Sequence, residues 1–177
     1  MIAPLRTALR LVLWPVIRAV VWAQAQFEIA HNEALLKRLD ADDRRTVGLY
    51  GRIRIVKPEG CKVGAHVSIH DADWNATGGI TIGRYVHFGP RVAILTVSHN
   101  IDGRAIPYDN TVVAKPVVIE DFCWIGQDVV IAPGSYVEEG FASRYAPVVS
   151  GRIPRGSIIW SAEIPPAQNS RHGPIRR

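Results

Sequence analysis

The stretch that decides the fold is Gly79–Ile106, GITIGRYVHFGPRVAILTVSHNIDGRAI. Large apolar residues recur in it every six positions, and small or β-branched residues follow each of them four places later. The two sets are Ile82, Phe88 and Ile94, and Val86, Val92 and Ser98. An α-helix repeats about every 3.6 residues and a lone strand about every two, so a period of six fits neither. It indicates a short strand and a turn repeated along a solenoid.

The rhythm resumes after a polar loop, so the repeat continues toward the C-terminus. Its later positions are Ile119, Ile125, Ile131 and Val137, with Cys123, Val129, Ser135 and Phe141 four places after them. Glycines directly after repeated residues are expected to supply the positive φ that a tight corner requires. They are Gly64, Gly83, Gly89 and Gly126.

Changes in composition and periodicity along the chain divide it into three predicted segments. Residues 1–46 form a helical segment and a charged linker, and residues 47–160 form the solenoid, with a loop at 100–116. The solenoid begins with a glycine-punctuated β segment that is expected to cap its exposed end. Residues 161–177 form an extended basic tail.

Residues 5–22 predict an amphipathic helix, with Arg6, Arg10 and Arg18 outside its apolar stripe. The segment is too short and too charged to span a bilayer, which needs about 20 mainly apolar residues. Three interpretations stay open: packing on a neighbouring subunit or on the solenoid end, peripheral contact with a membrane surface, and a secretory signal. Pro15 and Arg18 interrupt the apolar core that a secretory signal requires.

Charge and cysteine content indicate which partners and which compartment to expect. The 177 residues carry a net charge of +5, with a pI near 9.6, and the basic residues gather at the two ends. Neither a zinc-finger spacing nor an aromatic–basic RNA motif occurs, so no nucleic-acid partner is expected. Cys61 and Cys123 are two lone cysteines, which indicates buried, reduced thiols in a cytoplasmic protein.

Two motifs identify a related family. The residues Ser98–Asn100 read SHN, and Trp124–Gly140 reads WIGQDVVIAPGSYVEEG. Together with the hexads, they resemble the hexapeptide-repeat acyltransferases over residues 60–160. The resemblance is to the sugar O-acetyltransferase branch, which includes galactoside, maltose and nodulation-type enzymes and relatives in polysaccharide biosynthesis. It implies a left-handed parallel β-helix, a homotrimer with active sites between subunits, acetyl-CoA as donor and no metal.

His99 is the predicted catalytic base. Transfer of an acetyl group from a thioester to a hydroxyl requires a base near neutral pH, and imidazole has an ordinary pKa of about 6.5. His99 matches the loop histidine of the family, whereas His66 and His87 are expected to be outward repeat residues.

Five further residues are predicted to bind the acceptor. The family has an asparagine that faces the histidine, and the corresponding position here is His70 or Asp71. Nearby polar residues are therefore expected to orient the acceptor hydroxyl or His99, although each is also typical of a solvated turn. The predicted acceptor residues are Asp71, Asp73, Asn75, Asn100 and Trp124.

The donor site is predicted in the last coils. The positions that match the family's contacts to coenzyme A are Gln127, Tyr145 and Ser150. The sequence departs from the family here, because Tyr145 replaces a small residue and Gly151 replaces a basic one, with Arg152 beside it. Arg152 is predicted to meet the cofactor phosphates as a charge partner, and a solvated arginine is the competing interpretation.

The predicted function is thus acetyl transfer from acetyl-CoA to a hydroxyl of a sugar or glycan precursor. The protein is expected to be a cytoplasmic homotrimer, either with or without peripheral contact with a membrane. Three alternatives stay open. They are an amino-sugar N-acetyltransferase, a non-catalytic repeat scaffold suggested by irregular last coils, and a metal-binding solenoid of the carbonic anhydrase type, which needs three converging histidines.

Overall fold

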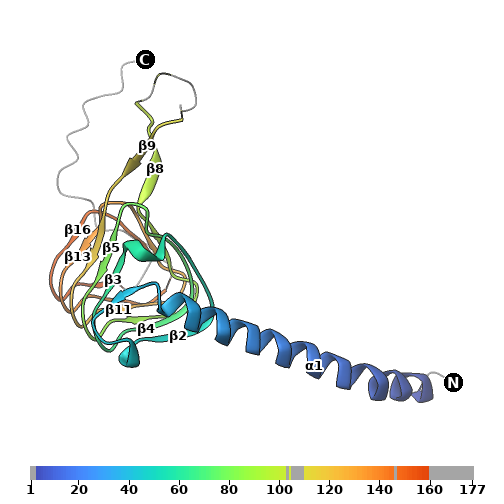
Figure 1. The fold of residues 1–177 in the computed structure, drawn as a ribbon. Coiled ribbons are helices and arrows are strands. Elements are labelled where there is room, and N and C mark those ends of the chain that lie inside the picture. The colour runs from blue at the N-terminus through green and yellow to red at the C-terminus, as the bar shows by residue number, and fades with distance from the viewer. Residues whose placement is uncertain (1–2, 103, 105–109, 146, 160–177) are drawn as a thin grey trace.

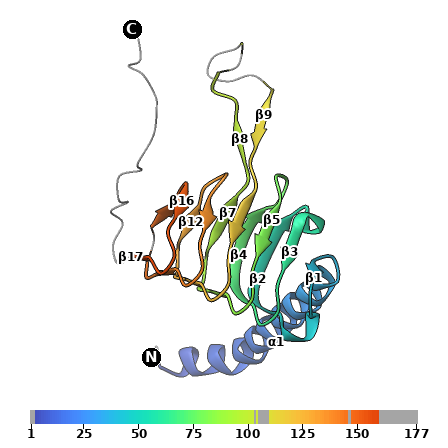
Figure 2. The ribbon, with the colours of Figure 1, turned by 90° about the vertical axis from the view of Figure 1, so that its left-hand side faces the viewer.

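The computed structural model describes residues 3–102, 104, 110–145 and 147–159. The chain forms a parallel β-solenoid of about six turns, which one long helix joins at its N-terminal end (Figures 1 and 2). The fold therefore confirms the solenoid that the hexads predict. The predicted tail at 161–177 and the loop residues 103 and 105–109 lie outside the described residues.

Parallel pairing between successive turns builds three faces. Face 1 contains β1 (Asp40–Ala41), β3 (Cys61–Val63), β5 (Ile80–Ile82), β10 (Val117–Ile119), β13 (Tyr136–Val137) and β16 (Arg152–Ile153). Face 2 contains the first halves of β2 (Gly48–Val56) and β4 (Ser68–Asn75), then β6 (His87–Phe88), β11 (Trp124–Ile125), β14 (Ala142–Ser143) and β17 (Ile158–Ile159). Face 3 contains the second halves of β2 and β4, then β7 (Ala93–Leu95), β12 (Val130–Ile131) and β15 (Val148–Val149).

The registers align the repeated residues into columns inside the solenoid. On face 1, Val63, Ile82, Ile119, Val137 and Ile153 are consecutive partners, and all are buried. Face 3 stacks Trp74, Ile94, Ile131 and Val149 in the same way. Each side chain thus packs on its counterpart in the next turn, and this burial of apolar surface is the main stabilising term of the fold.

The last turns keep this register. β13 pairs with β16 and β14 pairs with β17, and the inward residues Val149 and Ile153 are buried. The irregular sequence after Ser143 therefore changes the corners and outer surface but leaves the pairing intact. The sequence argument for a degenerate, non-catalytic end loses its physical basis.

The corners between faces stack into three edges. The loop edge joins face 3 to face 1 and contains 57–60, 76–79, the described residues of 96–116, 132–135 and 150–151. The aromatic edge joins face 1 to face 2 and contains 64–67, 83–86, 120–123, 138–141 and 154–157. The ion-pair edge joins face 2 to face 3 and contains 51–52, 71, 89–92, 126–129 and 144–147, of which residue 146 is not described.

The predicted role of the corner glycines is wrong. Positive φ occurs two places after them, at non-glycine residues such as His66, Tyr85 and Asp128. Gly126 is needed for another reason, since a Cβ there would lie 1.8 Å from the carbonyl oxygen of Arg144 in the next turn. The first corner residue must be small because successive turns approach each other closely there.

Ser98 is not an inward residue, contrary to the hexad phase. The fully buried Thr96 ends the column, its Oγ1 donating to the carbonyl of Asn75 and accepting from the backbone N–H of Gly78. Beyond it, β8 (Val97–His99) and β9 (Val112–Ala114) form an antiparallel hairpin that projects from the loop edge (Figure 2). The Lys115 N–H donates to the Thr96 carbonyl and closes the insertion, so the solenoid resumes in register.

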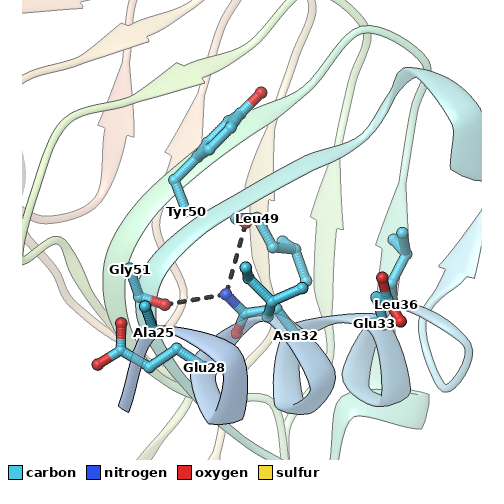
Figure 3. A pocket seen from close by; sticks show the side chains of 9 residues that line it. Ala25, Glu28, Asn32, Glu33, Leu36, Leu49, Tyr50 and Gly51 are labelled. Atoms are coloured by element: carbon cyan, nitrogen blue, oxygen red, sulfur yellow. Dashed lines mark hydrogen bonds between the residues drawn. The ribbon is translucent and has the colours of Figure 1, made fainter. Parts of the chain in front are cut away.

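Helix α1 (Ala3–Leu36) covers β2, the first strand of faces 2 and 3. Leu35 is buried in the core, and His31 Nε2 lies 3.0 Å from the carbonyl oxygen of Ile53. Asn32 Nδ2 donates to the carbonyls of Leu49 and Gly51 (Figure 3). The short 3-10 helices η1 (Arg44–Thr46) and η2 (Pro58–Gly60) complete the first turn. Within the described ranges, no helix reaches the length and apolar character needed to cross a membrane.

Cys61 and Cys123 are both free and buried, as predicted. Burial raises the pKa of the Cys61 thiol to about 12, and it raises the pKa of Cys123 as well. Both side chains therefore remain protonated and unreactive at neutral pH.

Replacing Phe88 with alanine tests the interior columns. Phe88 is fully buried, with its ring centroid 5.0 Å from that of Trp74, so Phe88→Ala leaves a cavity that the stacked turns cannot close. The free energy of unfolding in urea should fall by about 3–5 kcal/mol. Tyr85→Ala, which removes an exposed ring from the aromatic edge, should cost less than about 1 kcal/mol. Equal losses would contradict the assignment of the core.

Candidate active site

His99, the predicted base, stands at the end of β8 on the hairpin of the loop edge. Its side chain is exposed, and its Cα is opposite Val112 of β9. The hairpin lifts the imidazole away from the regular coil, because the chain leaves the column at Thr96. The exposed imidazole therefore lies at the surface of the projecting hairpin.

Of the predicted acceptor residues, Asn100 shares the loop edge with His99, and Asn75 ends face 3 next to that edge. Asn100 stabilises the hairpin, its Nδ2 donating to Thr111 Oγ1 at 3.1 Å and its Oδ1 accepting from the Asp102 N–H. Asn75 lies at the root of the loop, opposite Leu95, and its Oδ1 accepts from the Thr77 N–H. The Asn100 side chain therefore stabilises the hairpin that carries the histidine, whereas the Asn75 side chain stabilises the turn that follows β4.

The carboxylates Asp71 and Asp73 are not brought to His99 within one protomer. Asp71 lies on the ion-pair edge, across face 3 from the loop edge, and its Oδ1 accepts from the Arg52 N–H at 2.9 Å. Asp73 points outward from face 3 and forms an ion pair with Arg54 at 2.7 Å. Neither carboxylate can orient His99 of its own protomer.

The predicted donor residues are divided between edges. Gln127 and Tyr145 are bridge partners on the ion-pair edge, where Gln127 Nε2 donates to Asp128. Ser150 is exposed on the loop edge. Arg152 lies on face 1, in an ion pair with Glu138 at 2.6 Å and 5.0 Å above the ring of Tyr136. One protomer therefore does not assemble these four residues into a single site.

Face 2 carries a polar aromatic cluster that sequence reasoning did not find. Ser68 Oγ lies 2.5 Å from Nδ1 of His87, and the rings of His70 and Tyr50 stack with centroids 4.6 Å apart. The ring centroids of His70 and His87 are 5.4 Å apart, and Trp124 is the ladder partner of His87 in the next turn. Trp124, predicted to bind the acceptor, thus belongs to this face 2 cluster.

Burial and the proximity of His70 lower the pKa of His87 below its ordinary value. The imidazole is therefore uncharged at neutral pH, and its Nδ1 shares a hydrogen bond with the Ser68 hydroxyl.

The histidines do not converge as a metal site requires. In the part of the chain that the structure describes, no group of three His, Cys, Asp or Glu side chains could hold a metal ion. His66 lies on the aromatic edge, stacked on Tyr85 at 4.6 Å, away from His70 and His87 on face 2.

Comparison with known proteins finds acetyltransferases among the proteins similar to this chain. No family model matches the chain. A putative acetyltransferase of Schizosaccharomyces pombe is 32% identical over 87 residues, which cover 49% of this chain and 42% of that protein. The putative colanic acid biosynthesis acetyltransferase WcaF of Escherichia coli is 27% identical over 135 residues, 75% of this chain and 72% of WcaF.

A solved structure agrees with these relatives. The hexapeptide-repeat acetyltransferase VCA0836 of Vibrio cholerae, complexed with acetyl-CoA, matches with a TM-score of 0.58 at 26% identity, over 73% of this chain and 70% of that one. The chain is thus similar in sequence to acetyltransferases and in fold to a hexapeptide-repeat acetyltransferase. This similarity confirms the predicted resemblance and the solenoid fold, and VCA0836 itself is complexed with acetyl-CoA, the predicted donor. The chain spans less than half the length of the S. pombe relative.

Titration of His87 tests the face 2 cluster. Its folded-state pKa is lowered, so the unfolded chain binds this proton more tightly, and acidification below about pH 6.5 favours unfolding. The NMR titration midpoint of His87 should lie below the ordinary value and rise toward it in His70→Asn. His66→Asn, on another edge, should leave the midpoint unchanged. A midpoint at or above the ordinary value in the wild type would refute the arrangement.

Proposed function

We propose that this chain is a cytoplasmic acyltransferase that moves an acetyl group from acetyl-CoA to a hydroxyl of a sugar or glycan precursor. The observation that carries the proposal is the placement of His99, exposed on a hairpin of a solenoid that is similar to acetyltransferases. The relationship to a colanic acid biosynthesis enzyme supports a glycan acceptor. The two free, buried thiols fit a reducing compartment.

In the proposed reaction, His99 acts on the acceptor. Its imidazole takes the proton of the acceptor hydroxyl as the oxygen attacks the thioester carbonyl. Acetyl-CoA supplies the activated acyl group, and His99 then returns the proton to the departing thiolate. No covalent acyl-enzyme is needed, because acceptor and donor react directly.

The charges of the last turns bear on where the donor phosphates bind. Arg152, the predicted phosphate partner, is paired with Glu138, and the nearby Arg155 is paired with Glu139, so both arginines already have carboxylate partners. Lys115 lies on the loop edge beside the hairpin, with its aliphatic stem over Gly134. We therefore assign the role of phosphate partner to Lys115, which sequence reasoning did not select.

The distribution of charge supports the trimer that the family resemblance implies. In the turns that follow β4, faces 2 and 3 present uncharged residues outward, namely Trp124, Ala142, Ala93, Val130 and Val148. In the same turns, face 1 presents Thr81, Val118 and Tyr136 outward together with one charged residue, Arg152. Packing face 3 of one protomer on face 2 of the next would bury the uncharged surfaces around the ion-pair edge.

Such packing would account for the finding that the predicted acceptor and donor residues lie on different edges and faces of one protomer. The loop edge lies at the outer end of face 3, so His99 of one protomer would approach face 2 of its neighbour. The neighbour would then contribute its Trp124 and the face 2 cluster to the acceptor site. We propose that the active site is completed in this way.

Replacing His99 tests the proposed chemistry. In an assay of thiol release from acetyl-CoA with a panel of sugars and amino sugars, His99→Gln should lower kcat by at least about 100-fold, because glutamine cannot accept the proton. The matched control is His31→Gln, on α1 and away from the loop edge, which should retain activity. A preference for amino groups over hydroxyls would select N-acetylation. Absence of both turnover and calorimetric acetyl-CoA binding would favour the scaffold.

A mixing experiment tests the shared site. Trimers of His99→Gln and of Trp124→Ala should each be inactive alone. After dissociation and random reassembly of the two variants, about one quarter of wild-type activity should return, because about one interface in four then combines an intact His99 with an intact Trp124. Light scattering checks the trimeric mass of each preparation. A fully active monomer, or no recovery from mixed trimers, would contradict the proposal that two protomers form the site.

A further inference from the structure

The N-terminal part of α1 extends beyond the solenoid (Figure 1). The contacts of the helix with β2 come from its last turns, through His31, Asn32 and Leu35. Every described side chain from Leu13 to Phe27 is exposed. The exposed segment is about 22 Å long, so it is a substantial surface rather than a frayed end.

This exposed segment is strongly apolar, and its apolar residues cover more than one stripe. Leu13, Ile17 and Val20 follow one helical stripe, and Trp14 lies on the adjacent one with 61% of its surface exposed. Trp22 is 67% exposed and lies about 140° around the helix from Ile17. A seam between two helices uses one narrow stripe. A lipid interface can cover a wide arc, and tryptophan is enriched at that depth.

The charge of the segment has one sign. Between Met1 and Phe27 the sequence contains Arg6, Arg10 and Arg18 and no acidic residue, the first being Glu28. Basic residues interspersed with tryptophan and aliphatic residues are the composition of helices that lie in the headgroup region of anionic membranes.

We propose that α1 docks on the surface of an anionic membrane, lying in the interfacial plane with Leu13–Trp22 among the headgroups. Arg18 contacts lipid phosphates, and the solenoid stays in the water beside the bilayer. The occupant of this apolar surface is therefore lipid rather than a second copy of the chain. This docking is independent of the acyl transfer proposed above, because none of the residues involved belongs to the candidate active site.

Vesicle co-sedimentation of the full chain tests the proposal. The protein should pellet with vesicles of phosphatidylcholine and phosphatidylglycerol, bind pure phosphatidylcholine less, and be released by alkaline carbonate. Ile17→Asp/Val20→Asp should lower the partition coefficient by at least about tenfold, because both charges enter the apolar stripe. The control Phe122→Asp, at an exposed aromatic residue of the solenoid, should bind as the wild type does. The variant Arg6→Gln/Arg10→Gln/Arg18→Gln should lose the preference for phosphatidylglycerol.

Several results would overturn the proposal. Failure of the wild type to bind either vesicle, or undiminished binding by Ile17→Asp/Val20→Asp, removes lipid as the occupant. A lower oligomeric mass of that variant in light scattering, with no vesicle binding by the wild type, identifies α1 as a contact between subunits. Retention in the membrane after alkaline carbonate treatment would replace surface docking with insertion across the bilayer. Circular dichroism and urea unfolding verify that each variant keeps the solenoid.

Discussion

The packing of each inward side chain on its counterpart in the next turn is the constraint on which the rest of the structure depends. Parallel ladders fix this alignment, as in the run Val63, Ile82, Ile119 and Val137 on face 1, where the backbone is paired on both sides and the side chains are buried. The pairing restricts strands and the first corner residues, but it leaves the length of a corner free. The hairpin between Thr96 and Lys115 is the result, because the hydrogen bond at its base returns the chain to register regardless of what extends outward.

In a solenoid built in this way, functional side chains can lie only on the edges and outer faces, because stacked apolar side chains fill the interior. Residues on one edge are repeated along the axis, whereas residues on different edges are held apart by a whole face. His99 on the loop edge and Asp71 on the ion-pair edge cannot meet in one chain for this reason. A catalytic centre that needs groups from two edges must therefore draw on a second protomer, as the proposed packing of face 3 on face 2 would provide.

The sequence predicts the solenoid well because the six-residue period is imposed by core packing at every turn. It predicts individual positions less well where a backbone feature determines them. Ser98 follows the phase of the hexads yet lies outside the core, because the chain leaves the interior column two residues earlier, at Thr96. Gly126 matches a corner signal, but the reason for glycine is the carbonyl of the next turn rather than its own φ. The pairing of Ser68 with His87, and of Arg91 with Asp128, depends on the lengths of inserted segments, which the period alone does not give.

The apolar residues of helix α1, unlike those of the repeats, are not all explained by packing in the core. A solenoid exposes the apolar interior of its first turn, and Leu35 together with the amide of Asn32 covers β2 there. That task is complete within the last turns of the helix, yet the helix continues toward the N-terminus with exposed tryptophan and aliphatic side chains. Exposing so much apolar surface to water is unfavourable, and a helix needed only as a cap would carry polar residues beyond the contact. The sequence of the outer turns therefore reflects a second environment, and their arginines without acidic neighbours indicate that this environment is anionic.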